Sequence, residues 1–213
     1  MKSKPSKHKY LPLPRAYLSW SALQLFRRDK AEYIRHYVYG EPREFTSPFM
    51  DFGSMFAEYL ENRRKRHPDP VVDMIVKNMP RIGRPECEIR AEMPSKQGII
   101  RLLGKCDQYD VKTHDFNEYK TGKGKWTNGK ANGHGQMKFY QLMLWLKYGV
   151  TANKKNLIWV ETEDENGDVR PTGKIQTYPV EIKVEDLLTF ANEIKRDAIA
   201  ISEIYQKEIN QNI

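Results

Sequence analysis

Cysteine is scarce in this chain, and long apolar runs are absent. Its 213 residues include only two cysteines, Cys87 and Cys106, too few for the disulfide framework of a small secreted protein. The first residues are too polar for a signal peptide, and no apolar segment is long enough to span a bilayer. We therefore expect two free thiols, no membrane contact and a cytoplasmic location in a bacterium, an archaeon or the host of a phage.

Positive charge exceeds negative charge. The chain has 36 Lys and Arg against 28 Asp and Glu, which gives a formal net charge of +8 and a pI near 9.3. This balance favours a polyanionic partner such as nucleic acid, although basic charge also serves solubility alone. The basic start predicts a flexible tail over residues 1–17, which either touches nucleic acid or is inert. Residues 18–213 are expected to form a single domain.

The segment from Gly104 to Lys120 carries the main chemical signal. It is typical of two consecutive strands of a hairpin, with Asp107 on the first strand and Glu118 and Lys120 on one face of the second. Carboxylates of this kind suit Mg²⁺ or Mn²⁺, and a neighbouring lysine suits a phosphate or an attacking water. The pattern indicates metal-assisted phosphodiester hydrolysis. The competing interpretation is a set of solvated hairpin charges.

Flanking motifs favour the catalytic interpretation. In order, the chain has Gly-x-x-Asp ending at Asp107, Glu-x-Lys-Thr-Gly-Lys starting at Glu118, and Gln136-x-x-x-Tyr140 opening an apolar helical run. This order resembles the PD-(D/E)XK nuclease superfamily and, within it, the RecB-like branch of CRISPR adaptation nucleases and helicase-linked exonucleases. Residues 18–26 and 53–61 are similar to the first two helices of that branch.

The resemblance implies a fold and a set of roles. The fold would be α/β, with a mixed central β-sheet flanked by helices, as in a restriction-endonuclease-like core. Asp107 and Glu118 would bind Mg²⁺ or Mn²⁺, Lys120 would assist the water or the transition state, and Gln136 and Tyr140 would position the nucleic-acid strand.

The chain departs from the family pattern at two places. Ala57 stands where the family usually has a histidine ligand. Glu61 matches a family position and is our candidate metal ligand, Glu58 is the alternative, and both would otherwise be solvated glutamates. Many CRISPR adaptation nucleases hold an iron–sulfur cluster with four cysteines, and two cannot supply that ligation. We therefore predict no iron–sulfur cluster.

A loop rich in Gly, Lys and Asn joins the two halves of the motif over residues 122–135. Lys123, Lys125 and Lys130 can meet phosphates, and Trp126 can stack on an unpaired base. The loop would then be a DNA-binding gate beside Lys120. An uninvolved surface loop is the equal alternative.

Periodicity and turn residues divide the chain into alternating elements. We predict helices over 19–39, 47–66, 70–79, 136–148 and 184–209, and strands over 86–93, 98–111, 115–120, 156–163 and 174–183.

The leading hypothesis is a divalent-metal-dependent deoxyribonuclease, an exonuclease in recombination, repair or mobile-element processing. It would act on single-stranded DNA or duplex ends. One alternative is a catalytically weakened DNA-binding or adaptor protein that keeps the fold. Another is the nuclease subunit of a helicase, recombination or CRISPR complex, since no Walker A motif is present.

Overall fold

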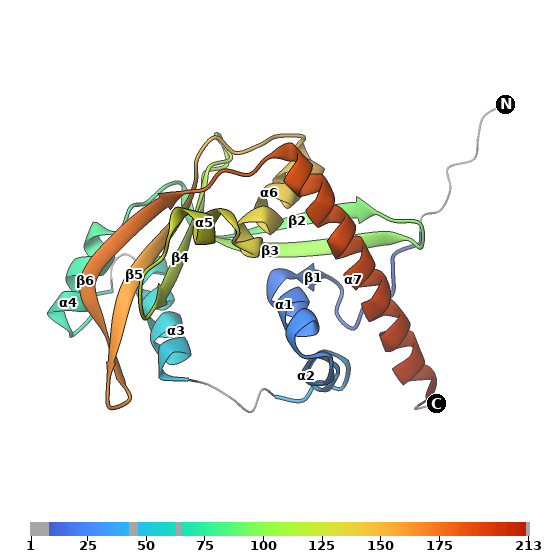
Figure 1. The fold of residues 1–213 in the computed structure, drawn as a ribbon, viewed down its shortest axis with the longest axis horizontal. Coiled ribbons are helices and arrows are strands. Elements are labelled where there is room, and N and C mark those ends of the chain that lie inside the picture. The colour runs from blue at the N-terminus through green and yellow to red at the C-terminus, as the bar shows by residue number, and fades with distance from the viewer. Residues whose placement is uncertain (1–8, 43–46, 63–64, 212–213) are drawn as a thin grey trace.

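The protein is described from a computed structural model, over residues 9–42, 47–62 and 65–211. A six-stranded sheet forms the middle of the molecule, and helices cover both of its faces (Figure 1). The strands are β1 (Leu18–Ser19), β2 (Arg84–Pro94), β3 (Ile99–Tyr109), β4 (Phe116–Gly122), β5 (Lys155–Glu165) and β6 (Asp168–Pro179). The pairs β1–β3 and β4–β5 are parallel and the other pairs antiparallel. The predicted α/β class with a mixed sheet is confirmed.

Strand β3 has a break along one of its edges. The long hairpin partner β2 occupies the other edge from Ile99 to Tyr109. On the broken edge, β1 pairs with Leu102 and Leu103, whereas β4 pairs with only Gln108 and Tyr109. The backbone between these two short ladders must therefore find other hydrogen-bond partners.

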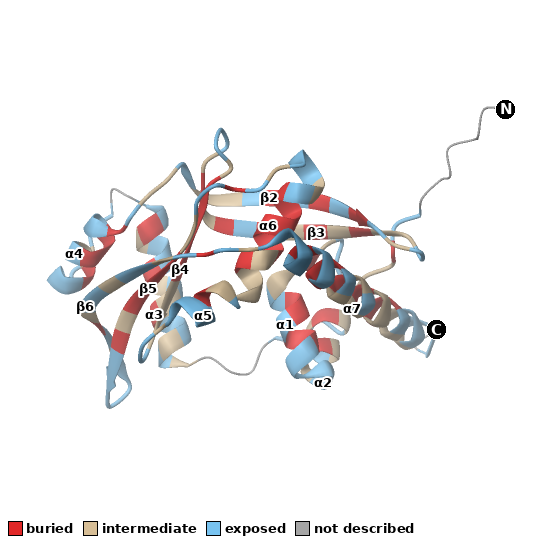
Figure 2. Cartoon of the chain, turned by 45° about the horizontal axis from the view of Figure 1, so that its top comes forward, coloured by how far each residue is buried: buried red, intermediate tan, exposed pale blue. Residues whose placement is uncertain are grey.

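Helices form one layer on each face of the sheet. They are α1 (Trp20–Arg28), α2 (Lys30–Tyr33), the π-helical turn η1 (Ile34–Val38), α3 (Pro48–Glu61), α4 (Pro70–Asn78), α5 (Asn128–Asn132), α6 (Gly135–Tyr148) and α7 (Val184–Gln211). The larger apolar core lies under α1, α6 and α7, and a smaller one lies between α3, α4 and the strands β4 and β5. Burial follows this arrangement, because α6 is buried on most sides and α7 on one face only (Figure 2).

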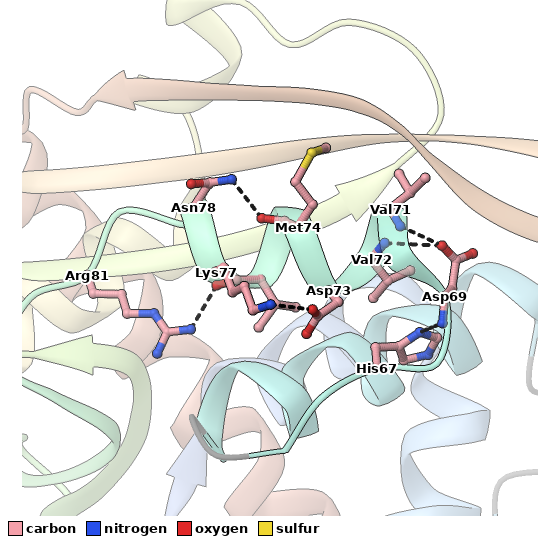
Figure 3. Close-up of polar contacts among 10 residues, drawn as sticks. His67, Asp69, Val71, Val72, Asp73, Met74, Lys77, Asn78 and Arg81 are labelled. Atoms are coloured by element: carbon pink, nitrogen blue, oxygen red, sulfur yellow. Dashed lines mark hydrogen bonds and ion pairs between the residues drawn. The ribbon is translucent and has the colours of Figure 1, made fainter.

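Helix α4 shows how the sequence sets its own helix ends. The side chain of Asp69 accepts hydrogen bonds from the backbone N–H groups of Val71 and Val72, at 2.7 and 3.4 Å (Figure 3). Lys77 pairs with Asp73 one turn earlier at 2.6 Å. Beyond the helix, the Arg81 guanidinium donates to the Val76 carbonyl at 2.8 Å. These contacts fix the helix start and the turn that leads into β2.

Three predicted elements differ in the structure. Helix α3, predicted over 47–66, ends at Glu61. The first helix was expected to run unbroken to residue 39, but Asp29 leaves it in an extended conformation and caps α2 by accepting from Glu32 N at 2.9 Å. The last strand starts at Asp168 rather than 174 and ends at Pro179. The helix α5 inside the 122–135 loop and the short strand β1 were not predicted.

The predicted N-terminal tail lies partly on the sheet. Leu11 is buried and its N–H donates to the Ile99 carbonyl at 2.9 Å, and Tyr10 forms a bridge with the same strand. Residues 9–11 are therefore held against β3, with Lys9 and Tyr10 still exposed, while residues 1–8 lie outside the described part. None of the helices in the described ranges combines the length and apolar character needed to cross a bilayer.

Candidate active site

One cleft of about 560 Å³ opens between α3 and the sheet. Its polar side is formed by Asp107 on β3, Glu118 and Lys120 on β4, and Gln136 on α6. Its other wall is apolar and comes from α3. The side chains of that wall include Phe49, Met50, Phe56, Ala57 and Leu60. The structure thus brings together four of the side chains that the sequence proposed for catalysis.

Asp107 lies at the break in the β3 edge. Its Oδ2 accepts a hydrogen bond from the backbone N–H of Tyr119 at 2.7 Å. The β3–β4 ladder ends at Gln108, so the Tyr119 N–H has no backbone acceptor on β3 there. The Asp107 carboxylate accepts this hydrogen bond instead. This contact joins the two strands and holds Asp107 against the residues on either side of Tyr119.

Glu118 and Lys120 form an ion pair on one side of β4. Lys120 Nζ lies 2.6 Å from Glu118 Oε1, and the side chains are 30 % and 1 % exposed. Tyr119 packs in the smaller core under α3 and α4, as strand alternation predicts. Among the described residues, the buried Glu118 Oε2 has no donor while both carboxyls are ionised, and a protonated Asp107 would donate to Glu118.

The electrostatics of the site reflect an excess of acid. Burial raises the pKa of Asp107 well above its ordinary value, and the charge of Glu118 adds to this rise. Burial also raises the pKa of Glu118, against the opposing effect of Lys120. Burial lowers the pKa of Lys120, but Glu118 and Asp107 outweigh it and leave that pKa above its ordinary value. The Lys120 ammonium is thus the counter-charge for two buried carboxyls, Glu118 and Asp107.

This donor set fits a hard divalent cation. Carboxylate oxygens are preferred by Mg²⁺ and Mn²⁺, and an unpaired buried carboxylate oxygen is costly unless a cation or donor meets it. Glu118 Oε2 is such an atom. In the described residues, no three His, Cys, Asp or Glu side chains are grouped closely enough to form a complete metal site as they stand. A bound cation would therefore need further ligands from a side-chain turn, water or substrate.

The two candidate glutamates of α3 lie in different surroundings. Glu61 lines the cleft, and so does Ala57, where the family pattern has a histidine. Glu58 is not among the cleft residues and instead pairs with Lys65. The position of Glu61 in the cleft favours it over Glu58 as a ligand, and the assignment stays a prediction.

Gln136 and Tyr140 have separate tasks. The Tyr140 hydroxyl donates to the Lys105 carbonyl on the broken edge of β3 and accepts from Gln136 Nε2, each at 2.6 Å. Tyr140 is 2 % exposed and does not line the cleft. Its hydroxyl therefore orients Gln136 and anchors α6, and it is a positioning group. Gly104 makes this packing feasible, because a Cβ there would lie 2.9 Å from the tyrosine ring.

The 122–135 loop is more ordered than the sequence suggests. Trp126 packs against Trp159 and His134, with ring centroids 5.3 and 5.5 Å away, and Lys130 Nζ lies 4.4 Å from its ring. A base would reach this ring only after Lys130 moved, so stacking by Trp126 stays a prediction that the described conformation does not favour. Lys123, Lys125 and Lys130 are exposed.

Glu86 was missed by the sequence reasoning. It lies on β2 between the pairs Pro85–Gln108 and Cys87–Cys106, and therefore opposite Asp107. It lines the same cleft, has a φ of 50°, and pairs with Lys105. The signal was available, because counting back from the turn after Pro94 in an antiparallel hairpin places Glu86 at this position.

Comparison with known proteins identifies the fold. The crystal structure of SSO0001 matches with a TM-score of 0.51 and 16% identity, over 88% of this chain and 77% of that one. Crystal structures of Rai1 from Scheffersomyces stipitis and, in complex with pU5-Mn2+, from Candida albicans match with TM-scores of 0.31 and 0.30 and identities of 14% and 12%. They cover 87% and 88% of this chain and 50% and 52% of those chains. No protein-family model and no curated protein sequence matches. The likeness to SSO0001 concerns the fold alone, and the two Rai1 matches carry no argument.

Proposed function

We propose that this protein is a divalent-metal-dependent nuclease that hydrolyses phosphodiester bonds in DNA. The observation that carries the proposal is the meeting of Asp107, Glu118 and Lys120 in one cleft, with Glu118 Oε2 buried and without a donor. The net charge of +8 supports a polyanionic substrate.

Each residue of the cleft has a task in this proposal. Asp107 and Glu118 would hold Mg²⁺ or Mn²⁺, which supplies activation of the attacking water and neutralisation of phosphate charge. Lys120 keeps an ammonium beside these carboxylates and directs it toward the scissile phosphate or the water. Gln136, oriented by Tyr140, offers its amide to the strand. The apolar α3 wall, with Phe49 and Met50, would contact sugar or base.

The exonuclease role, in recombination, repair or mobile-element processing, is part of the same proposal, as is action on single strands or duplex ends. The cleft is walled on one side by α3, which suits a strand that enters singly more than an intact duplex. A helicase, recombination or CRISPR partner protein would deliver such a strand.

A DNA-binding or adaptor protein with weakened chemistry is the second candidate. Ala57 in the cleft favours it, because that position offers no ligand, and the described residues contain no ready group of three ligands. Under this proposal the basic surface would bind DNA and the cleft would turn over slowly or not at all.

A single titration separates the two candidates. Purified protein is incubated with end-labelled single-stranded DNA, duplex DNA and RNA, while Mg²⁺ or Mn²⁺ is varied and EDTA serves as the blank. Asp107→Asn is the matched control, because it keeps the size of the side chain. Metal-dependent cleavage that this variant loses supports the nuclease. DNA binding without cleavage by the wild type supports the adaptor.

A further inference from the structure

Glu86 and Asp107 stand at opposite positions of the β2–β3 hairpin, at a point where the ladder pairing between them is interrupted. The ladder keeps one register on both sides of them, with Pro85 opposite Gln108 and Cys87 opposite Cys106. The φ of 50° at Glu86 interrupts the regular pairing, so the hairpin register brings the two residues to the same level of the two strands without fixing the distance between their side chains. Both residues line the cleft that holds Glu118 and Lys120.

This placement is unfavourable for the sheet alone. Like charges directly opposite each other destabilise a strand pair. Glu86 also has a φ of 50°, a conformation that residues other than glycine, asparagine and aspartate rarely adopt. Two unfavourable features at one residue indicate that it has a functional role rather than a packing role.

The neighbouring Glu118 indicates that this role is cation binding. Its side chain is 1 % exposed, and Oε2 has no donor among the described residues. Its other oxygen and one oxygen of Asp107 already accept hydrogen bonds, from Lys120 and from the Tyr119 backbone. A cation at the unpaired oxygen would lie in the same cleft as the carboxylate of Glu86.

We propose that Glu86 turns from Lys105 to become a third carboxylate ligand, with Asp107 and Glu118, of a divalent cation in this cleft. The turn is required because, as they stand in the described residues, these three side chains are not grouped closely enough to hold a metal. The proposal rests on the metal site of the proposed nuclease and extends it to β2, a strand outside the nuclease-like motifs. The cation ligated by these three residues would be hard and divalent, such as Mn²⁺ or Mg²⁺.

Lys105 is the counter-ion that the metal would replace. Its ammonium pairs with Glu86, and the lysine side chain is 60 % exposed. The Glu86 side chain is only 19 % exposed, but a divalent cation carries twice the charge of the ammonium and can compete with it for the carboxylate. The released ammonium would then lie at the cleft edge, where a substrate phosphate can meet it.

Direct Mn²⁺ binding tests the proposal without relying on cleavage. Binding is measured by titration calorimetry, and by electron paramagnetic resonance of the free Mn²⁺ ion, for the wild type, Glu86→Gln, Asp107→Asn and Glu88→Gln. Glu88 is the matched control, because it is the next residue on the same face of β2, is ion-paired with Arg90 and does not line the cleft. Thermal unfolding in EDTA confirms that each variant is folded.

The expected result is a graded loss of affinity. Glu86→Gln weakens Mn²⁺ binding roughly tenfold or more, the scale of losing one oriented carboxylate at a metal site. Asp107→Asn weakens it at least as much, and Glu88→Gln leaves it unchanged. Lys105→Met strengthens binding more in the wild-type background than in the Glu86→Gln background, because the Lys105 ammonium pairs with Glu86 and interacts more weakly with Asp107 and Glu61.

The outcomes separate this inference from the proposed function. Wild-type Mn²⁺ affinity in folded Glu86→Gln overturns the inference, even where the wild type cleaves DNA. Mn²⁺ binding that depends on Glu86 and Asp107, in a protein that cleaves no nucleic acid, supports the inference and ends the nuclease proposal. A wild type that binds no Mn²⁺ overturns both.

Discussion

The carboxylate of Asp107 accepts a hydrogen bond from the backbone N–H of Tyr119 at 2.7 Å, across two strands whose ladder ends at the pair Gln108–Asn117. Asp107 therefore joins β3 to β4 at the point where the strands separate. The cleft lies where the two strands separate. The Asp107 side chain, which bonds the Tyr119 backbone, also lines this cleft together with Glu118. Substitutions at this residue should affect folding and chemistry by different routes.

Two replacements of Asp107 should separate these routes. Asp107→Asn keeps an oxygen for the Tyr119 N–H, whereas Asp107→Ala leaves that N–H without its partner. We expect both variants to lower cleavage by roughly 10²-fold or more, and only the alanine variant to lose about 1 to 3 kcal/mol of unfolding free energy. Urea denaturation and a metal-dependent cleavage assay measure the two effects. Equal stability of the two variants would contradict the structural role.

Glu118 and Lys120 should matter for turnover beyond their ion pair. Glu118→Gln removes the charge beside the proposed cation, and Lys120→Ala removes the ammonium near the phosphate. We expect each to lower the rate with Mg²⁺ or Mn²⁺ by roughly 10²-fold or more, while circular dichroism shows the fold retained. Near-wild-type turnover of either variant would remove it from the catalytic assignment.

The raised pKa of Asp107 predicts how stability varies with pH. A carboxyl whose pKa is higher in the folded state holds its proton more tightly there than in the unfolded chain. The contribution of Asp107 to the unfolding free energy should therefore be greatest below its ordinary pKa of 3.8, and it should be lost as the pH rises through the raised pKa. Asp107→Asn, compared with the wild type in EDTA by denaturation across pH 4 to 8, should fall less steeply. An identical slope would refute the shift.

Glu61 and Glu58 offer a matched test on one helix. Glu61 lines the cleft, whereas Glu58 lies outside its lining and pairs with Lys65. Glu61→Gln should raise the Mn²⁺ concentration for half-maximal cleavage, because an amide is a weaker ligand for a hard cation than a carboxylate. Glu58→Gln should leave it unchanged. If both variants titrate like the wild type, α3 contributes no ligand and the metal depends on β2, β3 and β4.

The sequence predicted residues that act locally better than those that depend on tertiary contacts. Strand alternation placed Glu118 and Lys120 together, and the spacing of the motifs led to Gln136. The sequence predicted that Tyr140 would position the nucleic-acid strand. Its contact with the Lys105 carbonyl joins residues far apart in the chain, so the sequence pattern did not indicate it. Glu86 escaped notice because its partner lies 21 positions away, so that only the hairpin register connects them.

Trp126 shows the same limit. A tryptophan among glycines and lysines is typical of an exposed stacking residue, but the ring is packed between Trp159 and His134. Trp159 lies on β5, which pairs beside β4, and this neighbour is not evident from the loop itself. Burial by a distant element, rather than local composition, decides the role of the ring.

The exposed lysines of the 122–135 loop should govern DNA binding more than chemistry. Lys123, Lys125 and Lys130 follow the strand of Lys120, and each phosphate contact adds to the salt dependence of affinity. Replacing all three with alanine should weaken DNA binding, reduce the salt slope by up to about three phosphate contacts, and leave saturated turnover largely unchanged. Binding curves measured over a series of salt concentrations test this.

A control triple variant at Lys112, Lys183 and Lys207, which are exposed and outside the cleft lining, separates local contacts from net charge. It removes the same charge and should change the salt slope less. Overlapping salt series for the loop variant and the wild type would exclude the loop from DNA binding.

Trp126→Ala should lower thermal stability more than it alters the preference for single-stranded DNA, because the ring is packed.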